Sequence, residues 1–353
     1  MDSKTVITKE TKNKIRVDYE GKLTVKERLL NKLKSSHTWI KVIVNIFRFI
    51  LMLGVSYVII YPFISRIAAS FMTKEDIVDA TVSLIPKTPT VEIYKYLIIE
   101  NKYFEALLNT VLLSLLCAII QTMIACLVGY GLAKFKFKGN KLLMVLVVIT
   151  MIIPHKTLQL SMLRHFTDFD LMKVMAWEYP GIVDLIIDPF IEHNQLDLTE
   201  TFAPLIILSV FGLAFKNGLY IYLMRQFFKG VPDELEESAY VDGSGVFRTF
   251  FQIILPLSVP MMITIFLFSF SWQWTDEFYT TLFFRSETNK MYMMPDVYKY
   301  IPESLQTEYA GKTLYYNAIQ NTAGMLIIAP LIIIYLFCQR YLVQGIERSG
   351  LVG

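Results

Sequence analysis

The chain has 353 residues, of which 54% are hydrophobic and only 18% are charged, and its formal net charge is +3. A soluble globular protein of this length has more charge and shorter apolar runs, so the composition indicates an integral membrane protein. Nucleic-acid binding would require a folded basic domain, and the sequence predicts none.

The N-terminal segment, residues 1–43, is rich in lysine and arginine. Basic residues before a first span keep that end of the chain in the cytoplasm. Within this segment, residues 23–34 alternate apolar and basic positions at helical spacing. We therefore expect an amphipathic helix lying on the anionic inner surface of the lipid bilayer.

Six apolar windows have the length of about 20 residues that is needed to cross a bilayer. They predict an all-α membrane domain over residues 44–343, with spans at 44–65, 107–133, 142–163, 202–227, 257–283 and 318–342. If the N-terminus is cytoplasmic, alternation places loops 71–104, 164–201 and 285–317 outside. It places the polar loop 229–256 and the tail 344–353 inside.

A polar stretch, residues 232–256, lies between the fourth and fifth windows. Pro232 suits the first position of a helix, and the carboxylates that follow it complement the positive end of the helix dipole. Gly243 can end this helix in a left-handed conformation, and Ser244 can cap a second helix that continues to Pro256. The sequence therefore predicts two short helices joined by a glycine at the membrane edge.

Several polar residues lie inside apolar windows. Charged groups at that depth cost several kcal/mol unless they meet water or a partner, which makes them functional candidates. Aromatic and polar side chains also alternate near the end of the fifth window, as in many sugar sites, although an interfacial aromatic belt has the same composition. The candidates are His155, Lys156, Lys216, Asn217, Trp272, Gln273, Trp274 and Asp276.

No catalytic or metal-binding pattern is present in the sequence. Cys117, Cys126 and Cys338 lie in apolar runs without the spacing of metal ligands. Gly311-Lys312-Thr313 lacks the earlier glycine of a phosphate-binding loop, because Gln306 stands at that position. We therefore expect that the chain is not an enzyme and that any ATP hydrolysis belongs to a partner.

The polar stretch resembles the cytoplasmic EAA loop in the permease subunits of binding-protein-dependent ABC importers. Glu237-Ser238-Ala239, Gly243 and Ile253–Pro256 match its pattern, with Ser238 replacing the first alanine. Other similar pieces follow in the order and spacing of carbohydrate permeases of the maltose (MalG) type. They are Asn109-Thr110, 129–139, 223–228, 272–276 and 339–345. We call residues 232–256 the EAA-like segment.

The resemblance implies the fold of a type I ABC importer permease in a bacterial cytoplasmic membrane, with both termini inside. The implied partners are a second, homologous permease subunit, a dimer of ATPase subunits that holds ATP and Mg²⁺, and an extracytoplasmic solute-binding protein. This chain would bind no cofactor itself. The residues implied to couple it to the ATPase are Glu237, Ala239, Asp242, Gly243, Leu255 and Pro256.

The implied substrate is an oligosaccharide, and several alternatives stay open. Lys156 and Lys216 could line a path for an acidic sugar, or could form ion pairs with another subunit or reach the bilayer surface. The acidic loop 164–201 could contact the solute-binding protein or a partner subunit. The chain could carry a non-sugar solute, or be a self-sufficient secondary transporter, which usually contains inverted repeats with broken helices.

Overall fold

The computed structural model describes residues 7–10, 16–19, 36–169, 196–285, 291–299 and 311–348. These residues divide between two compact units, residues 1–68 and 69–353. The elements in chain order are β1 (Ile7–Glu10), β2 (Arg16–Tyr19), α2 (Ser36–Ala69), α3 (Lys74–Val78), α4 (Glu92–Lys95), the π-helix η1 (Tyr96–Glu100), α5 (Tyr103–Lys134), α6 (Asn140–Ile152), the 3₁₀-helix η2 (His155–Leu158), α7 (Gln159–Thr167), α10 (Ala203–Val210), α11 (Asn217–Lys229), α12 (Glu234–Val241), α13 (Val246–Thr249), the π-helix η5 (Phe250–Ile254), α14 (Leu255–Trp274), α15 (Phe278–Phe283), α16 (Met294–Val297) and α17 (Lys312–Arg348).

The first unit contains a small strand pair and one long helix. Strands β1 and β2 pair antiparallel, with Ile7 opposite Tyr19 and Glu10 opposite Arg16. Helix α2 begins earlier than the predicted span, and its residues 39–69 are apolar enough to cross a membrane. The strand pair is an exception to the all-helical prediction, which is otherwise confirmed for the described residues. The amphipathic helix predicted at 23–34 lies outside them.

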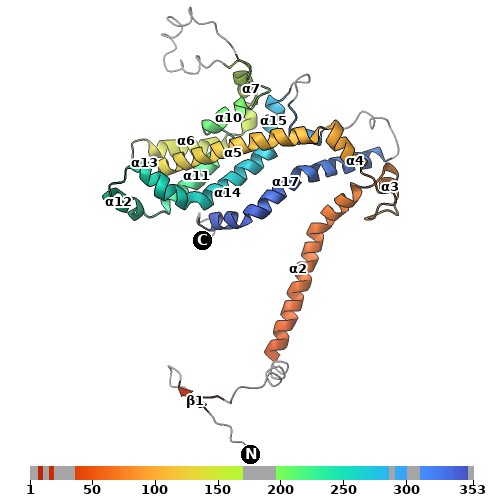
Figure 1. The fold of residues 1–353 in the computed structure, drawn as a ribbon, viewed down its shortest axis with the longest axis horizontal. Helices are drawn as coiled ribbons and strands as arrows, with labels where there is room; N and C mark the ends of the chain where they lie inside the picture. The colour runs from red at the N-terminus through yellow and green to blue at the C-terminus, as the bar shows by residue number, and fades with distance from the viewer. Residues whose placement is uncertain are drawn as a thin grey trace, which may run out of the picture. The chain divides into compact units, whose positions relative to one another are not determined.

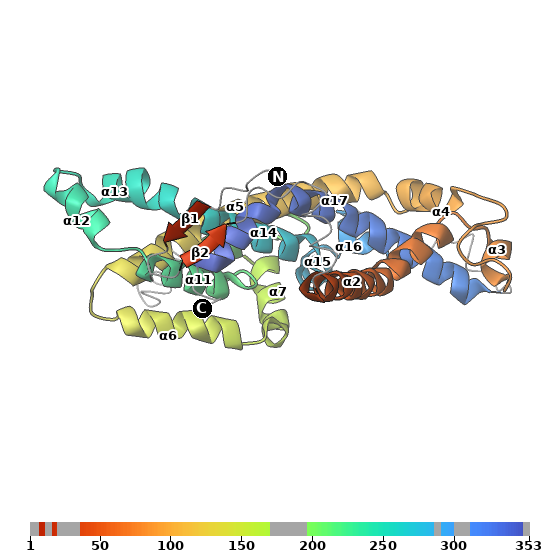
Figure 2. The same ribbon diagram turned by 90° about the horizontal axis from the view of Figure 1, so that it is seen from below.

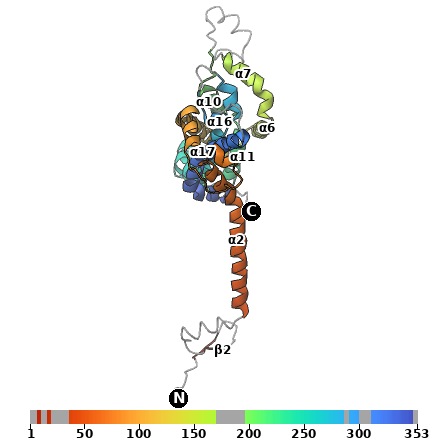
Figure 3. The same ribbon diagram turned by 90° about the vertical axis from the view of Figure 1, so that its right-hand side faces the viewer.

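The second unit is a helical bundle built around α5 (Figure 1). Helix α5 packs against α10, α11 and α14, and α14 packs in turn against α17. Apolar residues occur all round α5, and such a helix is stable only when several neighbours cover it. Helix α6 packs on α11, and an end-on view shows α6 and α7 at one edge of the bundle (Figure 3).

The predicted third span, 142–163, is sharply bent. Helix α6 ends at Ile152, and the two helical pieces on either side of the break meet at 88°. Pro154 explains the break, because it donates no backbone hydrogen bond and forces the preceding residue out of the helical conformation. Ile153 accordingly has φ −66° and ψ 119°.

The predicted fourth span, 202–227, is not one helix. Helices α10 and α11 are separated by residues 211–216, where Gly212 and Lys216 both adopt positive φ angles of 71° and 66°. The N–H groups of Leu213 and Ala214 both bond the carbonyl of Leu208, which closes the end of α10. Glycine takes this conformation without strain, and the polar Lys216-Asn217 pair then starts a new helix.

The sequence predicted that the second helix of the EAA-like segment ends at Pro256, but the structure shows that it continues beyond this residue. Residues 246–274 form one continuous helical span instead. Pro256 lies in the first turn of α14, immediately after the π-helix η5, in which the Leu255 N–H bonds the Phe250 carbonyl. The wider π turn places the missing N–H of Pro256 where the hydrogen-bond ladder is already rearranged, so the helix continues.

Four helices in the described residues are long and apolar enough to cross a membrane, or five if the bent pair counts as one span. Six spans, as predicted, result only if the broken α10–α11 pair also crosses the membrane as one span. Two views at right angles show α12 and the α3–α4 segment at opposite ends of the second unit (Figures 1 and 2). This agrees with the predicted placement of the EAA-like segment and loop 71–104 on opposite sides of a bilayer.

Candidate functional site

The EAA-like segment folds as two helices joined at a left-handed glycine. Gly243 has φ +80°, and its N–H bonds the carbonyl of Tyr240. The Ser244 N–H reaches back to the carbonyl of Ala239 at 2.9 Å. These two bonds form a Schellman motif, which satisfies the free carbonyls at the end of α12. Ser244 was expected to cap the next helix, but Gly245 precedes α13 instead.

A buried hydrogen bond joins α12 to the end of α5. The Tyr130 hydroxyl donates to Glu236 Oε1 at 2.7 Å, and Glu236 is only 7% exposed. The Tyr130 ring also lies against Phe250, with the ring centroids 4.7 Å apart. Both halves of the EAA-like segment therefore contact one side chain of α5.

Lys134, at the last turn of α5, forms a second connection to the same segment. Its ammonium group donates to the carbonyl of Val231 at 2.6 Å and to Asp233 Oδ1 at 2.5 Å. The hydrogen bond from Lys134 lowers the pKa of the Asp233 carboxyl. Sequence reasoning missed Tyr130, Glu236 and this role of Lys134. The signal was available, because all three lie in the stretches that resemble the permease family.

The predicted coupling residues lie in three settings. Glu237, Asp242 and Gly243 are exposed on α12 and the turn after it, whereas Ala239 is buried beneath them. Leu255 and Pro256 belong to the first turn of α14. Two apolar side chains near the turn are also strongly exposed, Val241 at 88% and Phe247 at 81%. The turn thus combines an exposed carboxylate with exposed apolar groups, a composition that suits contact with another protein.

The two breaks in the spans bring several of the intramembrane candidates together. The Phe215 ring lies edge-on to His155 and to Trp272, with centroid distances of 5.2 Å and 5.4 Å. The His155 Nδ1 lies 2.5 Å from the Tyr279 hydroxyl. The Lys216 ammonium lies 4.9 Å from the Phe215 ring centre and 5.2 Å from that of Trp272. A cation is therefore held between two aromatic faces.

A small cavity adjoins this cluster. Its volume of about 10 Å³ has room for about one water molecule, so no sugar ring fits in this conformation. Binding a sugar here would require the surrounding helices to move apart. Its walls are formed by Gln121, Phe215, Ser269, Trp272, Gln273, Asp276 and Tyr279.

A polar network crosses the bundle beside the cavity, and sequence reasoning missed it. Gln121 donates to Ser209 Oγ at 3.0 Å and accepts from Ser269 Oγ at 2.7 Å, and all three residues are buried. These links connect α5, α10 and α14. An uncharged glutamine inside an apolar span was the available signal, since a buried amide requires partners.

Two candidates lie apart from the cluster. Trp274 is fully buried and donates its indole N–H to the carbonyl of Ile327 at 2.9 Å, which ties α14 to α17. Lys156 is exposed and does not line the cavity. Asp276 contributes to a cavity wall, but its Oδ2 also accepts the Tyr279 N–H at 3.1 Å at the start of α15.

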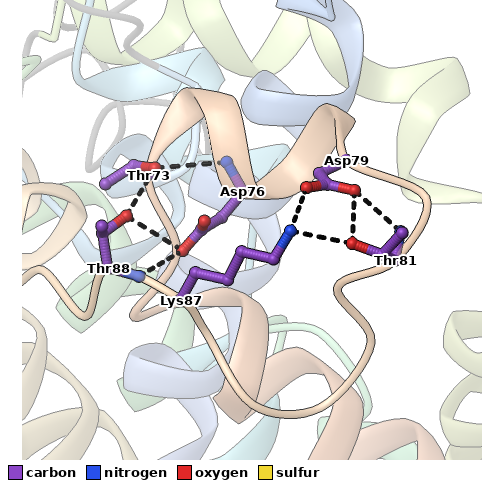
Figure 4. Close-up of polar contacts among 6 residues, drawn as sticks. All are labelled: Thr73, Asp76, Asp79, Thr81, Lys87 and Thr88. Carbon is purple, nitrogen blue, oxygen red and sulfur yellow. Dashed lines mark hydrogen bonds and ion pairs between the residues drawn. The ribbon is translucent and has the colours of Figure 1, made fainter.

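The opposite end of the unit carries a folded polar loop (Figure 4). Asp76 is 5% exposed and accepts from the Thr88 N–H at 3.0 Å, which closes the loop between them. Nearby, Asp79 accepts from Lys87 and Thr81, and these hydrogen bonds lower the pKa of the Asp79 carboxyl. Loop 71–104 is therefore ordered by its own side chains as well as by α3 and α4.

The sequence motif Asn109-Thr110 connects this end of α5 to the segment around α16. The Asn109 side chain donates to the carbonyl of Tyr292 at 3.1 Å, and the Thr110 hydroxyl accepts the Met294 N–H at 2.9 Å. Asn101 similarly donates to the carbonyl of Val297. Parts of two segments predicted on the outer side thus form one packed layer. Residues 170–195 of the acidic loop lie outside the described residues.

Residues 121–348 match a family model described as "Binding-protein-dependent transport system inner membrane component". This range includes the EAA-like segment, both broken spans and all of α17.

Curated relatives and a solved structure show similarity over most of the chain. The arabinooligosaccharides transport permease AraQ of Halalkalibacterium halodurans is 25% identical, over 85% of this chain and 93% of that protein. The polygalacturonan/rhamnogalacturonan permease YtcP of Bacillus subtilis is also 25% identical, over 87% and 97%. The maltodextrin permease MalD of Streptococcus pneumoniae is 27% identical, over 86% and 93%. A crystal structure of a bacterial ABC transporter that imports the acidic polysaccharide alginate has a similar fold, with a TM-score of 0.60, 20% identity, and coverage of 87% of this chain and 98% of that one.

Proposed function

Because the chain belongs to the family of binding-protein-dependent transport system inner membrane components, we propose that it is the membrane-spanning permease subunit of an ATP-driven oligosaccharide importer. The family resemblance inferred from the EAA-like segment is confirmed. A membrane component of such a transport system is not itself an enzyme, so the energy has to come from separate ATPase subunits.

One structural observation carries the proposed mechanism. The EAA-like segment exposes Glu237 while Tyr130 and Lys134 fasten the same short helix to the end of α5. A docked helix transmits force because its hydrogen bonds are internal and its length is fixed. Closure of two ATPase subunits around ATP would draw this segment toward its counterpart on a second permease and switch the bundle between inward-facing and outward-facing states.

The substrate proposal rests on relatives whose names specify arabinooligosaccharides, polygalacturonan, rhamnogalacturonan and maltodextrin. These names include neutral and acidic carbohydrates, and the shared chemistry is a chain of hydroxylated rings. A permease of the same class for a non-sugar solute is the competing function, because no residue described above reads out a hydroxyl pattern. The breaks in α6–α7 and α10–α11 do not favour a secondary transporter, since the family match already assigns the chain to a binding-protein-dependent system.

The assembly follows from the same family. A second permease subunit, a pair of ATPase subunits holding ATP and Mg²⁺, and an extracytoplasmic solute-binding protein would complete the complex in a bacterial plasma membrane. The EAA-like segment and both termini would face the cytoplasm. Loop 71–104 and the segment around α16 would face the solute-binding protein.

The proposed coupling role can be tested by charge reversal in the complete complex. Glu237→Lys should reduce accumulation of oligosaccharide in proteoliposomes at least tenfold. Reversing a charge at a docked interface costs about 2–5 kcal/mol of binding free energy. Glu234→Lys changes an exposed carboxylate on the same helix and serves as the matched control. Uptake of radiolabelled oligosaccharide and ATP hydrolysis would be measured together.

Three results would contradict parts of the proposal. Undiminished accumulation by the Glu237→Lys complex would remove Glu237 from the coupling contact. Concentration of solute by this polypeptide alone would show that it needs no separate ATPase. Failure of every oligosaccharide to stimulate ATP hydrolysis, with stimulation by another solute, would favour the non-sugar alternative.

A further inference from the structure

The break between α10 and α11 leaves hydrogen-bond donors without acceptors. At the start of α11, the Asn217 N–H bonds the carbonyl of Ala214, and the Tyr220 N–H bonds that of Lys216. Among the described residues, the N–H groups of Gly218 and Leu219 have no acceptor, and no side chain caps this end of the helix. Free N–H groups and the helix dipole make such an end attractive to anions.

A buried amide at the same place gives a second, independent observation. Asn217 is fully buried, and neither its Nδ2 nor its Oδ1 has a hydrogen-bond partner among the described residues. The Nδ2 atom lies 3.5 Å from the position that a Cβ on Gly212 would take, so the side chain turns back into the break. Burying an unsatisfied amide is costly, and such a group in a native protein usually indicates a missing partner.

Lys216 adds a positive charge to this end of the helix. It is half-buried, and among the described residues no carboxylate lies within 4.0 Å of its ammonium group. Its neighbours are the rings of Phe215 and Trp272, which attract a cation but do not neutralise it. The nearby Asp276 carboxylate already accepts the N–H of Tyr279. The break thus gathers donors and a cation, and Trp272 beside them is 48% exposed.

We propose that the α10–α11 break binds the carboxylate of an acidic sugar unit as the oligosaccharide crosses the membrane. Lys216 and the free N–H groups of α11 would hold the carboxylate, while the face of Trp272 stacks on the C–H surface of the ring. This inference rests on the proposed function and narrows it to substrates that contain uronic acids. The helices must part for the ring to enter, because the cavity beside Trp272 is too small for one.

The test compares two forms of one substrate in the complete reconstituted complex. The probes are an oligogalacturonate trimer and its fully methyl-esterified form, which differ in charge but scarcely in shape. Initial uptake rates would be measured against concentration. Lys216→Gln should raise the half-saturating concentration of the free acid about tenfold, because the charged hydrogen bond to the carboxylate is lost, and should leave that of the ester unchanged.

Two control variants separate recognition from folding. Lys216→Arg keeps the charge and should retain most of the preference for the acid. Lys229→Gln removes an exposed lysine at the other end of α11 and should change the half-saturating concentration of neither substrate. An equal effect of Lys216→Gln on acid and ester would overturn the inference.

Uptake by the wild-type complex distinguishes failure of this inference from failure of the proposed function. Uptake of the ester or of a neutral maltotriose without uptake of the acid would overturn the inference and leave the proposed function intact. Failure to import any of the three oligosaccharides would overturn both.

Discussion

Glu236 and Glu237 are neighbours in the sequence but have opposite surroundings. Glu236 is buried and accepts a hydrogen bond from the Tyr130 hydroxyl, whereas Glu237 is exposed to solvent. One carboxylate therefore fixes α12 to the bundle, and the other remains accessible to a partner.

Tyr130→Phe tests the inner contact. The change removes one hydroxyl and leaves a buried carboxylate short of a donor, so the free energy of unfolding should fall by about 1–3 kcal/mol. Tyr335→Phe removes the hydroxyl of a half-exposed tyrosine in α17 and should have almost no effect. Thermal denaturation of the purified proteins in detergent would compare them. Equal midpoints for the two variants would show that the bond contributes nothing.

The sequence predicted the conformation of a single residue best where the neighbouring residues determine it. The left-handed Gly243 followed from the polar helix before it, and the structure confirms that conformation. The Tyr130–Glu236 bond joins residues separated by 106 positions. No local pattern could specify that pairing, since burial of one glutamate rather than the next depends on where α5 ends in space. The functional roles of the candidate site residues stay predictions.

Among the elements, α5 and α11 approach each other closely at a glycine. A Cβ on Gly129 would lie 2.7 Å from the Cβ of Met224 and 3.0 Å from the backbone nitrogen of Arg225. Both distances are shorter than van der Waals contact, and one neighbour is backbone that cannot rotate away. Gly129 is therefore required by packing, and the contact it allows positions Tyr130 beside α12.

Gly129→Ala and Gly131→Ala should shift stability in opposite directions. The first forces α5 and α11 apart and should destabilise the protein by about 1–3 kcal/mol. The second adds a methyl group with nothing within 4 Å, and should stabilise the helix by up to about 1 kcal/mol because alanine is the better helix former. Melting temperatures of the two variants would show the difference. Destabilisation by both to the same extent would contradict the packing argument.

The positions of the apolar elements were predictable, but their continuity was not. Hydropathy identified α2, α5, α14 and α17 because each carries a long apolar run. The same measure joined α10 to α11, since only Gly212 and the Lys216-Asn217 pair interrupt that run. Pro154 follows the end of a helix, whereas Pro256 lies in the first turn of α14 after a π turn, and Pro62, Pro260 and Pro330 lie inside continuous helices. A proline in an apolar run therefore does not by itself predict where a helix ends.

For the whole molecule, the opposite ends of the second unit predict which residues face each side of the membrane. In a background with Cys338 changed to serine, Ile85→Cys and Lys138→Cys provide exposed thiols in the α3–α4 loop and between α5 and α6. Cys117 and Cys126 are buried. A membrane-impermeant maleimide applied to intact cells should label only the Ile85→Cys variant. The Lys138→Cys variant should be labelled only after the cells are permeabilised. The reverse pattern would invert the proposed orientation.

The unbroken helical path from Val246 to Trp274 has a geometric consequence. At a rise of 1.5 Å per residue, its 29 residues measure roughly 43 Å, most of the thickness of a bilayer with its headgroups. In the proposed mechanism this helix would act as a rigid rod between the EAA-like turn and the Trp272 cavity. A tilt of about 10° about one end would displace the other end by roughly 7.5 Å, which is more than one turn of an α-helix.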